Sequence, residues 1–214
     1  MDEERFARQR SFILEIDKEK LVQRQTHLTH HGRREDDAEH AWHMSVMAYL
    51  LREYANEDID IARTMVMTLT HDLVEIYAGD TYAYDAAGQA DAEDRERHAA
   101  EQLYALLPED QGRELRAIWE EFEANETPEA HFAHAMDNLQ PMLLNDSNDG
   151  GDWKAHGVRR AGPAGRNAVT RLGSEELADY VEGRLDAQVA AGNLLPDDPA
   201  DSQEPVAQMN YVDK

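Results

Sequence analysis

The sequence predicts an all-α fold, and three observations support this prediction. Apolar residues recur at helical spacing along most of the 214 residues. Helix start and stop signals separate these segments, among them Gly79, Pro108, Thr127-Pro128 and Ser174. The chain shows no internal repeat and no stretch with the apolar–polar alternation of a half-buried strand. We therefore expect one helical domain over residues 1–195 and a polar tail over 196–214.

Local signals place the elements of the first half. Phe6, Phe12 and Ile16 follow a period near 3.6 and predict the first helix, whereas the polar segment around Gly32 predicts a loop. Gly79 suits the end of the third helix because glycine adopts the left-handed conformation freely. The elements expected in order are a helix at 4–25, a loop at 26–37, helices from Asp37 to residue 55 and from Asp58 to Tyr77, and a loop at 83–90.

The second half is delimited more sharply. Pro108 stops a helix, Thr127-Pro128 combines a cap with proline at the first helical position, and Ser174 caps the last helix. The expected elements are helices at 93–107, 109–125 and 129–145, a glycine-rich loop at 146–157 with Trp153 and Lys154, a helix at 174–191, and the proline-containing tail from Pro196.

The charge balance limits the partners. The chain has 21 basic and 45 acidic residues, for a net charge of −24. This argues against a binder of nucleic acid polymers, which need clustered Lys and Arg, and against anionic membrane surfaces. A small phosphorylated substrate remains compatible, because a local pocket can be positive on a negative protein. No segment approaches the roughly 20 apolar residues of a membrane span, and the charged N-terminus has no secretory pattern, so we expect a cytoplasmic protein.

Ionisable residues lie on helix faces that should point into the core. His40 shares a face with Met44, His71 and Asp72 are adjacent on the third helix, and Asp137 lies on the sixth. Burying such groups without partners is costly. Two imidazoles and two carboxylates from three helices could together coordinate one divalent metal ion. A single histidine on an apolar face is more often a satisfied core residue, so the inference depends on the whole set.

The absence of cysteine means that nitrogen and oxygen must hold any metal. Two His and two Asp suit Mn, Co, Fe, Ni or Zn, with Mg a further candidate, and the sequence does not select among them. A second metal at His98, His131 and His134 is a weaker alternative, because the last two lie on helix faces different from that of Asp137.

Four stretches together resemble the HD-domain phosphohydrolase superfamily, whose pattern is H…HD…D, and within it the branch that contains bacterial 5′-deoxynucleotidases. They are "RREDDAEHAWHMSVMAYLL", "THDLVEIYAGDTYAYD", "LLPEDQGRELRAIWEEFE" and "TPEAHFAHAMDNLQPML", within a region from about Lys20 to Asp152. The resemblance implies a compact helical bundle around one metal, often a homodimer. It also implies the metal ligands His40, His71, Asp72 and Asp137, with Glu75 and Asp80 serving the attacking water or the leaving group.

Phosphate recognition also requires cations. We expect Arg24 at the end of the first helix; in the deoxynucleotidases that this chain resembles, an arginine there holds the substrate and a tryptophan follows it, whereas here Gln25 follows. Arg33 and His43 are further candidates for substrate binding, although His43 could instead support the ligand His40.

The function that these features favour is a metal-dependent phosphohydrolase acting on nucleoside or deoxynucleoside 5′-monophosphates. One alternative is a hydrolase of guanine alarmones, but Ile76 stands where those enzymes carry a further acid. Another is a non-catalytic metal-binding interaction module. Degenerate modules usually lose a ligand or the glutamate, and this chain retains all of them.

Overall fold

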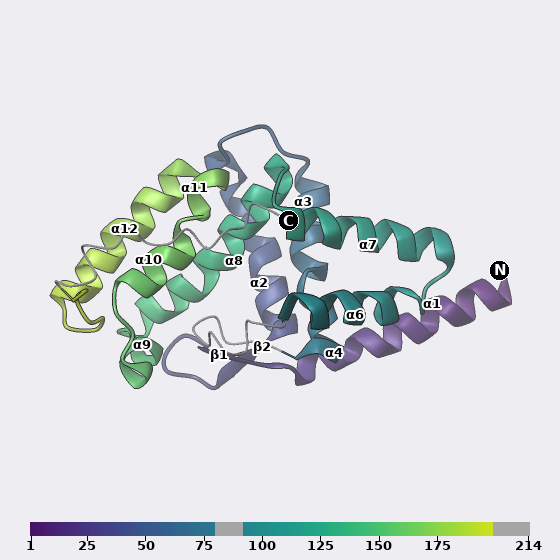
Figure 1. Cartoon of the computed structure of the whole chain (residues 1–214), viewed down its shortest axis with the longest axis horizontal. Coiled ribbons are helices and arrows are strands. Elements are labelled where there is room, and N and C mark those ends of the chain that lie inside the picture. The colour runs from purple at the N-terminus through teal and green to yellow at the C-terminus, as the bar shows by residue number, and fades with distance from the viewer. Residues whose placement is uncertain (80–91, 199–214) are drawn as a thin grey trace.

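The computed structural model describes residues 1–79 and 92–198 (Figure 1). The predicted loop at 83–90, the candidate Asp80 and residues 199–214 of the predicted tail lie outside this range. The described part is mostly helical and has one small two-stranded sheet, which confirms the all-α class. None of its helices is long and apolar enough to cross a membrane.

The prediction of one continuous helix over 4–25 is wrong. The helix α1 spans Glu3–Glu15, a 3₁₀ turn η1 covers Ile16–Leu21, and a strand β1 follows at Gln23–His27. This strand pairs antiparallel with β2 at Arg34–Asp36, inside the segment predicted to be a loop. Tertiary contacts override the helical pattern here, because Arg24 of β1 forms ion pairs with Asp37 and Asp72 farther along the chain.

The helix α2 begins as predicted and lies at the centre of the molecule (Figure 1). It spans Asp37–Leu51, and Asp36 and Glu39 form a reciprocal capping box at its start. A 3₁₀ turn η2 covers Arg52–Tyr54. Met44 is fully buried between α2 and its neighbours, which fixes the face that also carries His40.

The predicted third helix is interrupted at His71 and Asp72. The helix α3 spans Ile61–Thr70, a 3₁₀ turn η3 covers Asp72–Val74, and a short helix α4 covers Glu75–Ala78. In a continuous α-helix the carbonyl of Thr68 would accept from residue 72. Here it lies 3.1 Å from the ring nitrogen Nδ1 of His71 instead. Gly79 ends α4 with a φ of 78°, as its sequence position predicts.

Helices α6 to α8 follow the prediction closely. They span Ala92–Tyr104, Glu109–Ala124 and Pro128–Ser147. The hydroxyl of Thr127 accepts from the backbone N–H of Ala130, which confirms the predicted cap. Helix α8 packs against α2, α3 and α7 and thereby brings Asp137 to the same centre as His40.

The predicted glycine-rich loop at 146–157 is partly helical. Helix α9 spans Gly151–His156, and Trp153 is buried in the core formed with α2, α8 and α12. Two further helices that the sequence did not predict, α10 at Ala161–Asn167 and α11 at Thr170–Gly173, pack against α8. The last described helix, α12, spans Glu175–Ala190 and is capped by Ser174, as predicted.

The close approach of α11 to α8 gives a stability prediction. A Cβ at Gly173 would lie 2.3 Å from the carbonyl oxygen of His131, whereas a Cβ at Gly183 in α12 would meet no atom within 4 Å. We expect Gly173→Ala to lower the free energy of unfolding by about 1–3 kcal/mol through overpacking. Gly183→Ala should raise it by about 0.5–1 kcal/mol, because alanine favours the helix. Urea denaturation compares the two, and equal effects would contradict the packing described.

Candidate metal centre

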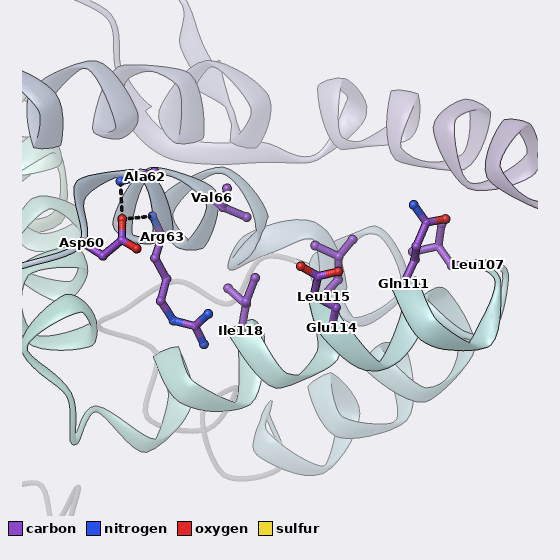
Figure 2. Close-up of a pocket in the computed structure, with 9 residues that line it drawn as sticks. All are labelled: Asp60, Ala62, Arg63, Val66, Leu107, Gln111, Glu114, Leu115 and Ile118. Atoms are coloured by element: carbon purple, nitrogen blue, oxygen red, sulfur yellow. Dashed lines mark hydrogen bonds between the residues drawn. The ribbon is translucent and has the colours of Figure 1, made fainter.

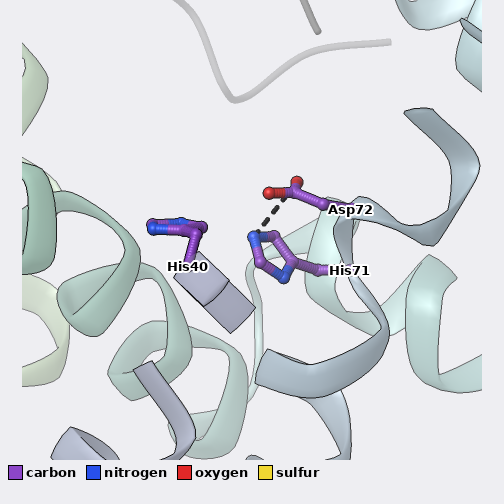
Figure 3. Close-up of side chains that lie close together, drawn as sticks. All are labelled: His40, His71 and Asp72. Atoms are coloured by element: carbon purple, nitrogen blue, oxygen red, sulfur yellow. Dashed lines mark ion pairs between the residues drawn. The ribbon is translucent and has the colours of Figure 1, made fainter. Parts of the chain in front are cut away.

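Four of the predicted residues meet in the interior. The Nε2 atom of His40 lies 3.1 Å from Asp137 Oδ1, and Nε2 of His71 lies 3.1 Å from Asp72 Oδ1 and 3.9 Å from Asp137 Oδ1. His40, His71 and Asp72 offer ligand atoms that all lie within 4.8 Å of one another (Figure 3). Both histidines are almost fully buried. Helix α2, the α3–η3 junction and α8 therefore bring the H, HD and D elements together.

The orientation of His40 is set by a chain of hydrogen bonds. The amide of Gln140 donates from Nε2 to Glu35 Oε2 at 2.9 Å, so its oxygen Oε1 faces His40. This oxygen can only accept, and it lies 2.9 Å from His40 Nδ1. In the neutral ring Nδ1 therefore carries the proton. The lone pair of Nε2 then points at the carboxylate of Asp137.

His71 is held in the same way by the backbone. Its Nδ1 donates to the carbonyl of Thr68, which leaves the buried Nε2 without a hydrogen-bond partner of good geometry. Metal-binding histidines characteristically donate their second ring nitrogen to a carbonyl or carboxylate in this manner. With both rings neutral, two imidazole lone pairs thus face two carboxylates at contact distance. The donor set fits a divalent cation, which would relieve this repulsion.

The electrostatics of the two rings agree with this view. Burial lowers the pKa of His40 to about 4, with Arg24 adding to the effect, so the ring is neutral at pH 7. Burial also opposes protonation of His71, but Asp72 and Asp137 outweigh it and raise the pKa of His71 to about 9. The carboxylates therefore draw positive charge to His71 Nε2, the atom where a cation would be bound.

Arg24 supports this centre from within the protein. Its Nη1 donates to Asp72 Oδ2 at 2.9 Å and to Asp37 Oδ1 at 3.3 Å, and its Nε lies 3.5 Å from Glu35 Oε1. The prediction that it ends a helix is wrong, because it lies in β1. Burial lowers the pKa of Arg24, but Asp72 and Asp37 more than offset this and hold it above the ordinary value.

The other predicted substrate contacts lie farther out. Arg33 is exposed and forms a two-pronged ion pair with Glu39, so the structure does not bring it to the centre. His43 is half-buried, and its Nδ1 lies 3.1 Å from Gln140 Nε2, one side chain away from His40. This arrangement favours a supporting role for His43.

Glu75 follows the ligands directly as the first residue of α4 and is partly buried. Its charge acts on Arg24, whose guanidinium contacts Asp72. The alternative second metal has no support in the described residues, because His134 donates to the carbonyl of Phe122 at 2.8 Å and His98 lies at the surface near Glu101.

Three polar residues at this centre escaped the sequence-based prediction. Gln140 lies three residues after Asp137 and therefore on the same side of α8, which is a usable signal. Glu35 and Arg166 carry no such signal. They lie on β2 and α10, which were not predicted, and the side chains that they contact are distant in sequence.

Comparison with known proteins places this arrangement in a family. The sequence model described as HD domain matches residues 16–177. The chain is 34% identical over 110 residues to the 5′-deoxynucleotidase HDDC2 of Bos taurus, covering 51% of this chain and 52% of that protein. It is 32% identical over 111 residues to the Homo sapiens protein of the same name, covering 52% and 53%. The chain thus spans about half the length of the curated relatives it matches.

A solved structure resembles most of the chain. It is described as a predicted metal-dependent phosphohydrolase from Magnetospirillum magnetotacticum MS-1, with a TM-score of 0.86 and 50% sequence identity, over 90% of this chain and 96% of that one. Because the family model covers more than half of the sequence and includes all four clustered residues, the chain belongs to the HD domain family.

Proposed function

We propose that this protein is a metal-dependent phosphohydrolase that cleaves nucleoside 5′-monophosphates, deoxynucleotides included, and releases inorganic phosphate. One observation carries the proposal: the Nε2 atoms of two buried imidazoles and two carboxylates converge from three parts of the fold, a donor set that fits one divalent cation. Additional support comes from the relatives named 5′-deoxynucleotidase and from the solved structure described as a metal-dependent phosphohydrolase.

In this proposal His40, His71, Asp72 and Asp137 hold one divalent ion, with Mn, Co, Fe, Ni, Zn and Mg as candidates. When bound, such an ion lowers the pKa of water and offsets charge on a phosphoryl oxygen. The surrounding residues hold the ligands in place, since Gln140 fixes the ring of His40 and Arg24 fixes the carboxylate of Asp72.

Proton transfer is assigned to Glu75 and Asp80. Glu75 lies one turn beyond His71 and Asp72, at the start of α4, where a carboxylate can take a proton from the attacking water or give one to the leaving alkoxide. Asp80, which is outside the described residues, would perform the complementary transfer. A cytoplasmic location stays a prediction.

Phosphate release from a panel of ribonucleotides and deoxynucleotides tests this function. Chelated protein is assayed with each candidate metal, and guanine alarmones are included. We expect release from at least one nucleoside 5′-monophosphate that depends on the added metal. Hydrolysis of alarmones alone, or of no compound with any metal, would reject the proposal.

We also propose that the protein forms a homodimer through one apolar face. Helices α2 and α3 pack against each other, with Ser45 hydrogen-bonded to Thr68, and both helices carry exposed apolar side chains. On α2 they recur at steps of four, three and one; the six residues are Trp42, Val46, Tyr49 and Leu50 on α2 and Val66 and Leu69 on α3. Trp42 is 64% exposed and Leu50 62%. Monomeric proteins rarely expose large apolar faces of this kind.

A groove extends this face. It has a volume of about 420 Å³, lies between α3 and α7, and is lined in part by Val66, Leu115 and Ile118 (Figure 2). None of the four candidate ligands lines it. Stable interfaces bury roughly 800 Å² on each partner, and the groove adds area beside the six side chains.

Light scattering at micromolar concentration tests the dimer. We expect twice the monomer mass of 24.3 kDa for the wild type and a monomer for Leu50→Glu, because a charge in the apolar interface is costly. Leu172→Glu, at a similarly exposed position on α11, should remain dimeric. A monomeric wild type would refute the proposal.

A further inference from the structure

Substrate phosphate at this centre would meet a mostly negative environment. Asp37, Asp72, Glu75 and Asp137 all act electrostatically on Arg24. A phosphomonoester carries up to two negative charges, so a single divalent ion leaves the centre short of positive charge. Arginine is well suited to supply it, because its planar fork of N–H groups matches phosphate oxygens.

Arg24 is poorly placed to meet this need. Its side chain is only 11% exposed and contacts three carboxylates, those of Glu35, Asp37 and Asp72. Its positive charge is therefore already balanced within the protein. The role that follows from these contacts is to orient Asp72, whereas the cation for the substrate must come from another residue.

Arg166 lies on α10, which packs against α8 (Figure 1), and its side chain approaches Asp137. Its Nη2 lies 3.7 Å from Asp137 Oδ2, on the carboxylate whose other oxygen faces His40. The side chain is 29% exposed. Among the residues that the structure describes, the guanidinium has one hydrogen bond, from Nε to Asn138 Oδ1 at 2.9 Å, besides this longer ion pair.

Asn138 fixes the direction of that guanidinium. Its own Nδ2 donates to the carbonyl of His134 at 2.8 Å, so its oxygen must face Arg166. The asparagine is buried and lies on α8 next to Asp137. It holds the Nε edge of the guanidinium and leaves the Nη groups beside the centre, without a second carboxylate in the described part of the chain.

We propose that Arg166 binds the phosphoryl group of the substrate. Its Nη groups donate to non-bridging phosphoryl oxygens of a phosphomonoester at the centre where His40, His71, Asp72 and Asp137 would hold the metal. This inference rests on the proposed phosphohydrolase function and adds a substrate-binding residue to it. The distance of 3.7 Å to Asp137 is long for an ion pair and allows the guanidinium to exchange that contact for a phosphate.

The competing role is structural, in which Arg166 only positions Asp137. The two roles predict different losses in Arg166→Ala. If Arg166 only positions a ligand, its removal lowers metal affinity by roughly 10–100-fold and leaves the phosphate affinity of the metal-loaded protein unchanged. If Arg166 binds phosphate, its removal lowers phosphate affinity while the protein still holds its metal.

Calorimetric titration of metal-loaded protein with inorganic phosphate separates these roles and needs no turnover. We expect Arg166→Ala to bind phosphate at least about 10-fold more weakly than the wild type, with close to one equivalent of metal retained. Arg166→Lys should be intermediate, because it keeps the charge and loses the fork. Arg160→Ala is the control: Arg160 directly precedes the same helix, has similar exposure and pairs with Glu182 and Asp186.

Unchanged phosphate affinity in Arg166→Ala, or no phosphate binding by the wild type, would overturn the inference. Loss of metal from Arg166→Ala, with wild-type phosphate affinity after reloading, would overturn it in favour of the positioning role. Failure of the proposed function is distinguishable, since it would show as an absence of nucleotide hydrolysis by the wild type. If the wild type does hydrolyse nucleotides, kcat/KM of Arg166→Ala should fall on the order of 10²-fold.

Discussion

Replacing His71 by alanine is expected to abolish metal retention and to reduce phosphate release on the order of 10³-fold or more. His71 Nε2 faces both Asp72 and Asp137, so its loss removes the nitrogen donor at the middle of the ligand set. Metal analysis after gel filtration should fall from close to one equivalent per chain to near zero. Thermal stability should then no longer respond to added metal, because the folded state no longer binds it.

His134→Ala provides a matched control for this variant. His134 stacks on the ring of Phe122 with centroids 3.9 Å apart, and His71 contacts the same ring at 4.8 Å. Both histidines are buried, so both variants leave a cavity beside Phe122 and should lose stability. Only His71→Ala should lose the metal. Full metal content in His71→Ala, or equal loss in both variants, would contradict the ligand assignment.

Replacing Glu75 by glutamine is expected to lower kcat on the order of 10²–10⁴-fold while metal content and fold stay intact. The amide is nearly isosteric with the carboxylate and keeps its hydrogen-bonding oxygen, but it can neither accept nor release a proton at neutral pH. Steady-state kinetics on metal-saturated protein measure this effect. Glu121→Gln is the control, because Glu121 lies on α7 and pairs with Arg63.

The kinetic pattern decides the role of Glu75. A rise in KM with kcat unchanged would indicate uniform substrate binding rather than proton transfer. Wild-type turnover in Glu75→Gln would remove the catalytic assignment. If Asp80→Asn also kept the wild-type rate, proton transfer by these two acids would be refuted, and His40, His71, Asp72 and Asp137 would be interpreted as a structural metal site.

The sequence predicted those parts of the fold whose causes are local. Thr127 and Ser174 cap helices in the structure as they were expected to, because a side-chain oxygen three residues before a backbone N–H suffices. The helix predicted over 4–25 ends at Glu15, and its last residues form a strand instead, in which Arg24 has partners 13 and 48 residues away, Asp37 and Asp72. The spacing of apolar residues along the chain cannot reveal contacts between residues so distant in sequence.

The same distinction applies to the site. His40, His71, Asp72 and Asp137 could be selected because together they match the H…HD…D pattern on helices that should pack in the interior, and the structure brings all four together. The residues that hold these four side chains in place could not be predicted. Arg166 comes from a helix that carries two glycines and a proline and was not expected, and Trp153, placed in a loop by its glycine neighbours, is buried in the core.

Titrating the chelated protein with a divalent metal while measuring phosphate release from a nucleoside 5′-monophosphate tests the central claim most directly. We expect no release from the metal-free protein, a linear rise up to one equivalent of metal per chain, and a plateau beyond it. Full activity without metal, or a rise that continues to two equivalents, would contradict a single catalytic metal at His40, His71, Asp72 and Asp137.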